Sequence, residues 1–183
     1  MGNIYLFLAE GFEEVEALSV VDIVRRAGLT IQTVSVTGHE TVTGAHEVPV
    51  KADMLFDATT IKREGVMLVL PGGLPGATNL AAHEGLRKVI LDFNTEGRLL
   101  SAICAAPLVY GQLGILKDKK ATCYPGFEKY LEGARTTGAM VEQDDNIITG
   151  KGPGAAFDFG FAIVTKLAGK EKADEVKAGM LLA

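Results

Sequence analysis

The sequence Leu-Leu-Ser-Ala-Ile-Cys-Ala-Ala-Pro at residues 99–107 joins an apolar run to the start of a helix. The apolar run ends at Cys104, two small residues follow, and Pro107 favours the first turn of a helix. The pattern predicts a strand, a sharp turn and a helix, with the Cys104 thiol exposed at the positive end of the helix dipole. Because the thiolate is the reactive form of cysteine, this turn predicts a nucleophile. The alternative is a buried core residue, as free cysteines commonly are.

Strand-like and helix-like segments alternate on both sides of this turn. Apolar or β-branched runs predict strands, and helical spacing of apolar residues predicts helices. Residues 38–51 predict a hairpin or an edge excursion, and Asp144-Asp145 predicts a tight turn between short strands at 140–143 and 146–149. The other predicted strands are 3–9, 30–36, 66–70, 99–104 and one that begins within 119–123, and the predicted helices are 13–27, 84–94, 107–113, 157–167 and 171–180.

This alternation predicts an α/β fold with a doubly wound, mostly parallel sheet and helices on both faces. We find no linker, repeat or low-complexity segment in the 183 residues, so we expect a single domain over 1–183. In such sheets, ligands bind outside the carboxyl ends of the strands. Residues 10–16, 71–76 and 105–107 follow three apolar strands and are therefore expected to form one site.

Charge and cysteine content restrict the partners and the compartment. The formal net charge is −5 and there is no long basic run, so we expect neither nucleic acid nor a membrane as a partner. No apolar stretch approaches the roughly 20 residues that span a bilayer, and the first residues predict a strand and not a signal peptide. Cys104 and Cys123 have no pairing pattern, which indicates a reducing, cytoplasmic setting.

Three glutamates, Glu13, Glu14 and Glu16, open the first predicted helix. Acidic residues in a first helical turn complement the helix dipole, and this alone explains most of them. A carboxyl that faces Cys104 from an apolar niche would instead have a raised pKa. In its protonated form it could donate a hydrogen bond to the sulfur or carry a proton to a substrate.

The sequence Pro-Gly-Gly-Leu-Pro-Gly at 71–76 follows a buried strand. Glycines there let the backbone approach a ligand closely, and the N–H groups of Gly73 and Ala105 could form an oxyanion hole for a carbonyl attacked by Cys104. An ordinary turn that needs positive φ angles is the equal alternative. Gly72 is expected to border the same pocket.

Other motifs point away from phosphate, metal and cofactor binding. Gly-Lys-Gly-Pro-Gly at 150–154 lacks the Ser or Thr of a Walker loop, so a tight turn before the next helix is the better interpretation. His39, His46 and His83 have no metal-ligand spacing with one another or with the cysteines, so we expect no metal. Where a protease would place a histidine base, the segment at 123–125 offers Tyr124.

Five motifs occur together in a fixed order, and jointly they resemble the ThiJ/PfpI superfamily. Within it, the chain is most similar to the clade of the human parkinsonism-associated protein and its bacterial relatives. The resemblance runs from the first strand to the last helix. The motifs are Glu-Gly-Phe-Glu-Glu-Val-Glu (10–16), Val-Asp-Ile-Val-Arg-Arg-Ala-Gly (21–28), Leu-Pro-Gly-Gly (70–73), Ala-Ile-Cys-Ala-Ala-Pro (102–107) and Gly-Pro-Gly-Ala-Ala-Phe-Asp-Phe (152–159).

The resemblance implies a flavodoxin-like sandwich of the class I glutamine-amidotransferase type, usually a homodimer without a cofactor. It implies that Cys104 is the nucleophile, that Glu16 is its protonated carboxyl partner, and that Gly73 and Ala105 are backbone donors near the thiol. One departure is Tyr124, which stands where several members of the family place a histidine. His46 lies where relatives contribute an arginine near the dimer interface, which suggests that it reaches the neighbouring subunit's pocket.

Two functions are compatible with this pattern. In the first, an enzyme adds Cys104 to a small reactive carbonyl such as methylglyoxal, and Glu16 moves a proton between adjacent carbons before water releases a hydroxyacid. This is glutathione-independent glyoxalase chemistry, and the same adduct describes a deglycase. In the second, Cys104 is a redox sensor that oxidises to sulfinate, or belongs to a chaperone. Peptidase activity and a role in thiazole-phosphate biosynthesis have no support in the sequence.

Overall fold

The computed structural model describes residues 2–182. These residues fold into eleven strands, seven α-helices and two short 3-10 helices. The α-helices are α1 (Glu14–Arg26), α2 (Ala58–Glu64), α3 (Gly76–Ala82), α4 (Glu84–Thr95), α5 (Pro107–Gln112), α6 (Ala156–Ala168) and α7 (Lys170–Gly179), and the 3-10 helices are η1 (Glu128–Tyr130) and η2 (Pro153–Ala155). The strands are β1 (Asn3–Leu8), β2 (Ile31–Ser35), β3 (Thr41–Thr43), β4 (Pro49–Lys51), β5 (Met54–Leu55), β6 (Gly65–Leu70), β7 (Leu99–Ile103), β8 (Lys120–Ala121), β9 (Arg135–Thr136), β10 (Val141–Asp144) and β11 (Ile147–Gly150).

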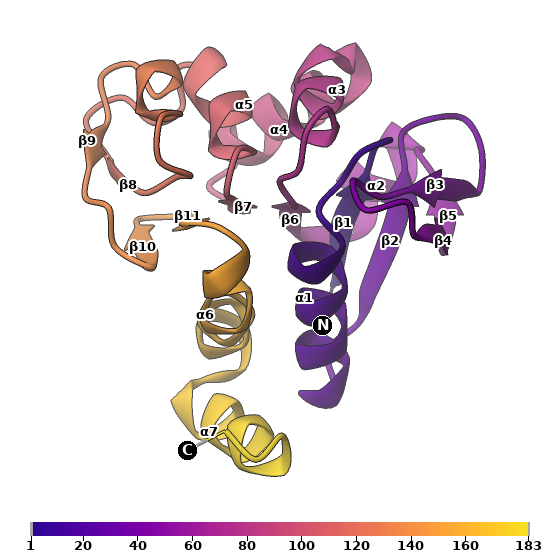
Figure 1. The fold of residues 1–183 in the computed structure, drawn as a ribbon, viewed down its shortest axis with the longest axis vertical. Coiled ribbons are helices and arrows are strands. Elements are labelled where there is room, and N and C mark those ends of the chain that lie inside the picture. The colour runs from indigo at the N-terminus through magenta and orange to yellow at the C-terminus, as the bar shows by residue number, and fades with distance from the viewer. Residues whose placement is uncertain (1, 183) are drawn as a thin grey trace.

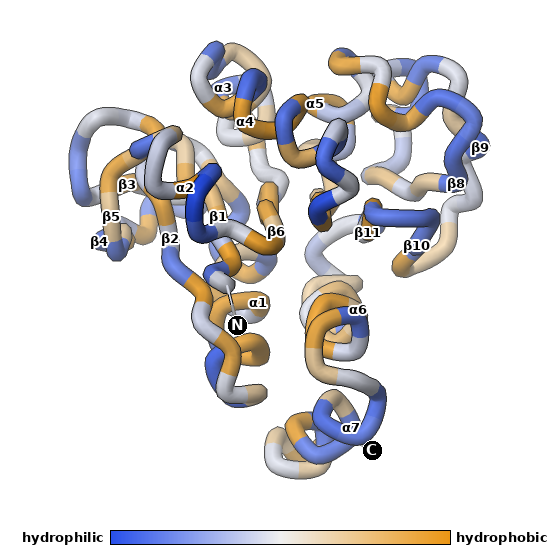
Figure 2. Tube along the Cα trace, turned by 180° about the vertical axis from the view of Figure 1, so that it is seen from behind, coloured by the Kyte–Doolittle hydropathy of each residue, from blue (hydrophilic) through white to orange (hydrophobic). Residues whose placement is uncertain are grey.

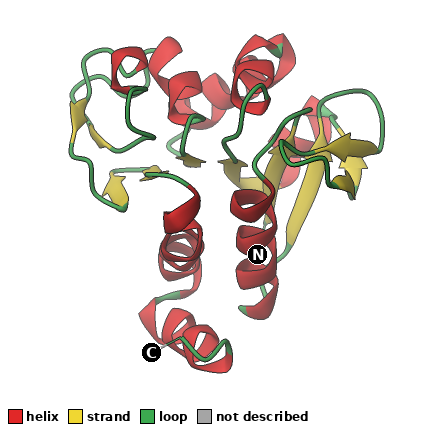
Figure 3. Ribbon diagram, viewed as in Figure 1, coloured by secondary structure: helices red, strands yellow, loops and turns green. Residues whose placement is uncertain are grey.

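A seven-stranded sheet forms the middle layer, in the order β10-β11-β7-β6-β1-β2-β5. Every neighbouring pair is parallel except β10 and β11, which form an antiparallel hairpin. Helices α1 and α6 cover one face of the sheet, and α3, α4 and α5 lie on the other (Figures 1 and 3). The predicted α/β class with a doubly wound, mostly parallel sheet is confirmed.

The order of the strands fixes where a ligand site can form. From β1 the chain runs outward to β2, whereas from β6 it runs to the opposite side, to β7. The direction of winding therefore reverses between the neighbours β1 and β6. Side chains and backbone groups that follow the carboxyl ends of β1, β6 and β7 converge at this point.

The core explains why the central strands are continuous apolar runs. Five of the six residues of β1 and four of the last five of β6 are fully buried, because helices cover both faces. Figure 2 shows the same division, with α6 coloured largely hydrophobic and hydrophilic stretches along α7, which lies farther from the sheet. Phe159 and Ile163 of α6 and Val20 and Ile23 of α1 belong to this core.

Most predicted elements are present, but the strands β5 and β9, of two residues each, were not predicted. The strand expected to begin within 119–123 is reduced to β8, which pairs with β9 outside the main sheet. The hairpin predicted around Asp144-Asp145 forms, but Asp144 belongs to β10 and the left-handed turn residue is Asp145, with a φ of 55°. Helices α2 and α3 were not predicted, since each has only seven residues and too few turns to give a periodic pattern.

Candidate active site

Cys104 occupies a strained turn between β7 and α5. Its φ is 64°, in the left-handed region that costs a non-glycine residue about 1–3 kcal/mol. Two backbone hydrogen bonds hold it there: Cys104 N–H donates to the Gly150 carbonyl at 2.9 Å, and Tyr124 N–H donates to the Cys104 carbonyl at 2.8 Å. The surrounding structure thus fixes a conformation that the residue itself disfavours, which is typical of functional positions.

The two glycines after β6 are required by close packing against this turn. A Cβ atom at Gly72 would lie 2.6 Å from Cys104 Cβ and 2.7 Å from Glu16 Oε2. Gly73 has a φ of 86°, and a Cβ atom there would overlap the backbone nitrogen of Glu13. The turn therefore needs a positive φ at Gly73, and its glycines also let the backbone pack closely against Cys104 and Glu16.

Glu16 is buried in the first turn of α1, directly behind Cys104. Its exposed fraction is 0%, and its Oε2 accepts a hydrogen bond from Gly72 N–H at 2.8 Å. Oε1 is also buried and has no hydrogen-bond partner among the residues described. Burial raises the pKa of Glu16 to about 7, against the opposing effects of Gly72 N–H and the Cys104 thiol. A proton held by this carboxyl or by the sulfur would satisfy Oε1.

The Cys104 residue is only 8% exposed, so it is less accessible than the sequence predicts. Burial raises the pKa of Cys104 to about 12, and the negative charge of Glu16 adds to this. The backbone N–H groups of Gly73 and Ala105 act in the opposite direction and lower the pKa. Desolvation and the neighbouring carboxylate therefore outweigh the backbone donors as long as Glu16 is ionised.

A cavity of about 250 Å³ opens in front of the sulfur. Glu16 is not among the residues that line it, although Glu13 is. The half-exposed Tyr124 lies at its wall. The sequence analysis placed Leu74 in the segment 71–76 expected at the site and Pro153 in a turn motif, but it did not single out Phe127, which lies in a loop without a chemical motif. The lining residues are Glu13, Gly73, Leu74, Cys104, Ala105, Tyr124, Phe127 and Pro153.

His46 lies outside this lining, in a second cluster next to the cavity. Its Nδ1 is 2.8 Å from Glu14 Oε2 and 3.6 Å from Glu13 Oε1. The hydrogen bond with Glu14 raises the pKa of the His46 imidazole, and burial raises the pKa of Glu13. One atom from each of the three side chains lies within 4.8 Å of the others, as a metal site would require. The search for histidine and cysteine spacing missed this cluster because two of its members are carboxylates.

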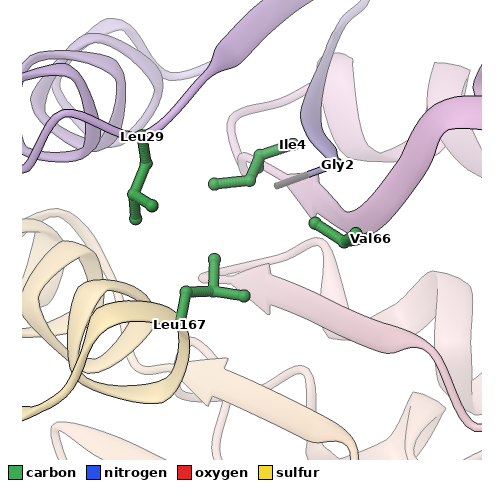
Figure 4. A pocket seen from close by; sticks show the side chains of 5 residues that line it. All are labelled: Gly2, Ile4, Leu29, Val66 and Leu167. Atoms are coloured by element: carbon green, nitrogen blue, oxygen red, sulfur yellow. The ribbon is translucent and has the colours of Figure 1, made fainter.

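Two further features lie outside the cavity in front of Cys104. Cys123 is buried, and burial raises its pKa to about 11. A cavity of about 230 Å³ lies elsewhere in the molecule, lined by Gly2, Ile4, Leu29, Val66 and Leu167 (Figure 4). None of its lining residues within 2–182 is titratable, so the described part of this cavity offers no side chain for proton or nucleophile chemistry. Over residues 2–182, the longest helices have 13 residues, and none of the helices can cross a membrane.

The fold and the site define a class: α/β sandwiches with a cysteine on a strand-to-helix elbow and a buried carboxyl behind it. Residues 2–166 match the DJ-1/PfpI family. The chain is 35% identical over 180 residues to the Parkinson disease protein 7 homolog of Danio rerio, covering 97% of this chain and 95% of the relative. The chain therefore belongs to the DJ-1/PfpI family.

Other relatives and solved structures agree with this assignment. Protein DJ-1 homolog B of Arabidopsis thaliana is 39% identical over 96% of this chain, but the chain spans only 40% of that relative's length. The glutathione-independent glyoxalase DJR-1.2 of Caenorhabditis elegans is 30% identical, covering 95% of this chain and 92% of the relative. The oxidized Toxoplasma gondii DJ-1 structure has a TM-score of 0.93 at 31% identity, and covers 100% of both chains.

Proposed function

We propose that this protein is a cysteine-dependent enzyme that acts on small reactive carbonyl compounds, as a glutathione-independent glyoxalase or a deglycase. The observation that carries the proposal is that Cys104 lines a small cavity and has the fully buried Glu16 behind it. The name of the C. elegans relative, a glutathione-independent glyoxalase, supports the same chemistry. The cavity volume of about 250 Å³ suits a small substrate and not a folded polypeptide.

The proposal requires the sulfur to carry the negative charge while Glu16 carries the proton. Glu16 is the deeper of the two groups, with 0% exposure against 8% for Cys104. A buried charge costs less at the atom that lies closer to water. Two backbone N–H groups also favour charge on the sulfur, whereas one backbone N–H group favours charge on Glu16. Above about pH 7 the pair then holds one proton, and that proton resides on the carboxyl.

The reaction follows from this charge distribution. The thiolate adds to the aldehyde carbon of an α-oxoaldehyde, and the new alkoxide takes a proton from water to give a hemithioacetal. The N–H groups of Gly73 and Ala105 stabilise the developing oxyanion, an effect worth about 3 kcal/mol for one such donor in other enzymes. Proton transfer from the aldehyde carbon to the adjacent carbon then gives a thioester. Water hydrolyses the thioester to a hydroxyacid and regenerates the thiol.

The test is the conversion of methylglyoxal to lactate by the wild-type protein, Cys104→Ser and Cys123→Ser. The proposal predicts turnover by the wild type, its loss in Cys104→Ser, and its retention in Cys123→Ser, since Cys123 does not line the cavity. Equal rates for the wild type and Cys104→Ser would overturn the proposal. Peptidase activity is not proposed, because Tyr124 replaces the histidine that such a mechanism needs.

A redox role for the same cysteine is the second candidate, as a sensor or as part of a chaperone. A thiolate in this cavity can be oxidised to sulfinate, and the N–H groups of Gly73 and Ala105 would stabilise the product anion. The similarity to a DJ-1 structure described as oxidized supports this candidate. The distinguishing result is oxidation of Cys104 under mild peroxide without any turnover of carbonyl substrates.

We also propose that the protein is a cytoplasmic homodimer. Val15 and Leu18 are exposed one turn apart on α1, and Val48 is also exposed, with its N–H 3.4 Å from Oε1 of Glu14 on the same helix. These exposed apolar side chains suit a symmetric contact between two copies, and the two free cysteines suit a reducing compartment. Light scattering on the wild type and on Leu18→Glu tests the dimer, which the substitution should dissociate.

A further inference from the structure

We infer that Glu13 is the catalytic base that moves the carbon-bound proton of the hemithioacetal, a task that the sequence analysis assigns to Glu16. The inference rests on the proposed function and adds a second carboxyl to it. In this account Glu16 keeps the proton that allows Cys104 to remain ionised. Glu13 works on the substrate itself.

Position within the site separates the two carboxyls. A base that abstracts a proton must be within hydrogen-bond reach of it. Glu13 lines the cavity in front of Cys104, whereas Glu16 does not and is fully buried. In addition, Gly72 N–H holds Glu16 Oε2 at 2.8 Å, which directs that carboxyl toward the backbone behind the cysteine.

Glu13 has a fixed backbone and an unengaged side chain. It is the N-cap residue of α1, yet its carboxyl does not cap the helix. Its N–H donates to the Gly72 carbonyl at 2.9 Å, and its own carbonyl accepts from Ala17 N–H at 3.1 Å. In the described part of the chain, no hydrogen bond is formed by its carboxyl, although that side chain is only 15% exposed. This carboxyl has an ion-pair contact with His46 at 3.6 Å but no hydrogen bond within the described residues, so its oxygens are available to a ligand.

The neighbouring residues His46 and Glu14 affect the pKa of the Glu13 carboxyl. His46 Nδ1 lies 3.6 Å from Glu13 Oε1 but is engaged by Glu14 at 2.8 Å. Burial and the charge of Glu14 raise the pKa of Glu13, and His46 opposes them. A raised pKa makes a carboxylate a stronger base for carbon-bound protons, provided that it stays ionised at neutral pH.

The proton and the electrons balance within the substrate. Glu13 takes the proton from the former aldehyde carbon, the electron pair of that C–H bond forms a C=C bond, and the π pair of the adjacent ketone moves onto its oxygen to give an enediolate. Glu13 then returns the proton to the adjacent carbon, while the hydroxyl proton leaves the first carbon's oxygen for the second. The first carbon is oxidised to the thioester level and the second is reduced from ketone to alcohol, so no external oxidant is needed.

The experiment compares four full-length proteins: the wild type, Glu13→Gln, Glu13→Asp and Asp22→Asn. Asp22 lies on the same helix, forms an exposed ion pair with Arg26 and does not line the cavity. Asp22→Asn therefore removes one negative charge, as Glu13→Gln does, but leaves the cavity unchanged. Three quantities are measured: kcat for methylglyoxal, its deuterium isotope effect with the aldehyde carbon labelled, and the rate of Cys104 alkylation by iodoacetamide. Alkylation reports the integrity of the site without any carbon-proton step.

We expect Glu13→Gln to lose roughly 100-fold or more in kcat, the usual contribution of a general base, with a larger isotope effect and alkylation no slower than in the wild type. Glu13→Asp should fall between, and Asp22→Asn should match the wild type. Any of three results for Glu13→Gln would overturn the inference while leaving the proposed function standing. These are a kcat near that of the wild type, an unchanged isotope effect, and a loss of alkylation rate as large as the loss in kcat. A wild type that does not convert methylglyoxal would overturn both.

Discussion

Gly72 and Cys104 are packed so closely that no side chain fits between them. A Cβ atom at Gly72 would lie 2.6 Å from Cys104 Cβ, well inside the contact distance of two carbon atoms. The turn after β6 and the turn after β7 therefore pack directly against each other, and Glu16 lies directly behind both. This contact sets the position of the sulfur relative to the backbone N–H groups that face it.

Substitution of Gly72 tests this unit. Gly72→Ala should destabilise the protein by about 1–3 kcal/mol, because the added methyl group must displace Cys104 or Glu16. Its effect on Cys104 alkylation should be larger than that of an equally destabilising substitution in α7. Urea denaturation and alkylation kinetics measure the two effects, and normal values of both would show that the packing is looser than described.

Glu16 should make stability depend on pH in an unusual direction. Its folded pKa, about 7, lies above its ordinary value of 4.5. The unfolded state therefore releases the proton first, and stability falls as pH rises from about 4.5 to about 7. The loss approaches roughly 3 kcal/mol by linkage. The free energy of unfolding of the wild type should fall relative to that of Glu16→Gln as the pH rises across this range. Curves of unfolding free energy against pH that run parallel for the two proteins would contradict the raised pKa.

Tyr124 should contribute through its backbone and not through its hydroxyl. Its N–H holds the Cys104 carbonyl at 2.8 Å, and this bond does not depend on the side chain. Tyr124→Phe should therefore keep kcat for methylglyoxal within about a factor of ten, since loss of a true acid or base costs at least a hundredfold. A larger loss would give the phenol a catalytic role that the present account omits.

Peroxide should distinguish the two cysteines. Cys104 faces a cavity and two backbone donors, whereas Cys123 is buried away from it, where burial raises its pKa to about 11. Intact-mass measurement after mild peroxide should find two added oxygen atoms in the wild type and in Cys123→Ser, and none in Cys104→Ser. Oxidation of Cys123 at a similar rate would remove the basis for a sensing role of Cys104.

The sequence predicts the fold well and the site only in part. The buried strand β6 and the turn after Cys104 are specified by the residues of their own segments, a continuous apolar run and two small residues. Both can therefore be recognised from the sequence. The sign of the pKa shift at Cys104 could not be predicted, because it depends on how deeply the sulfur and Glu16 are buried. The position of Glu13 in the cavity wall was missed for the same reason: Glu13 and Glu16 both begin α1, and only the packing decides which one faces the cavity.

The location of one proton is the central claim, and titration of the thiolate absorbance of Cys104 tests it most directly. The measurement uses Cys123→Ser, with the double variant Cys104→Ser/Cys123→Ser as the blank. If the proton shared by the pair stays on Glu16, the thiolate signal rises in a step near pH 7, where the pair loses its first proton. If the proton stays on sulfur, no thiolate is seen until the pH approaches about 12, and the proposed mechanism fails.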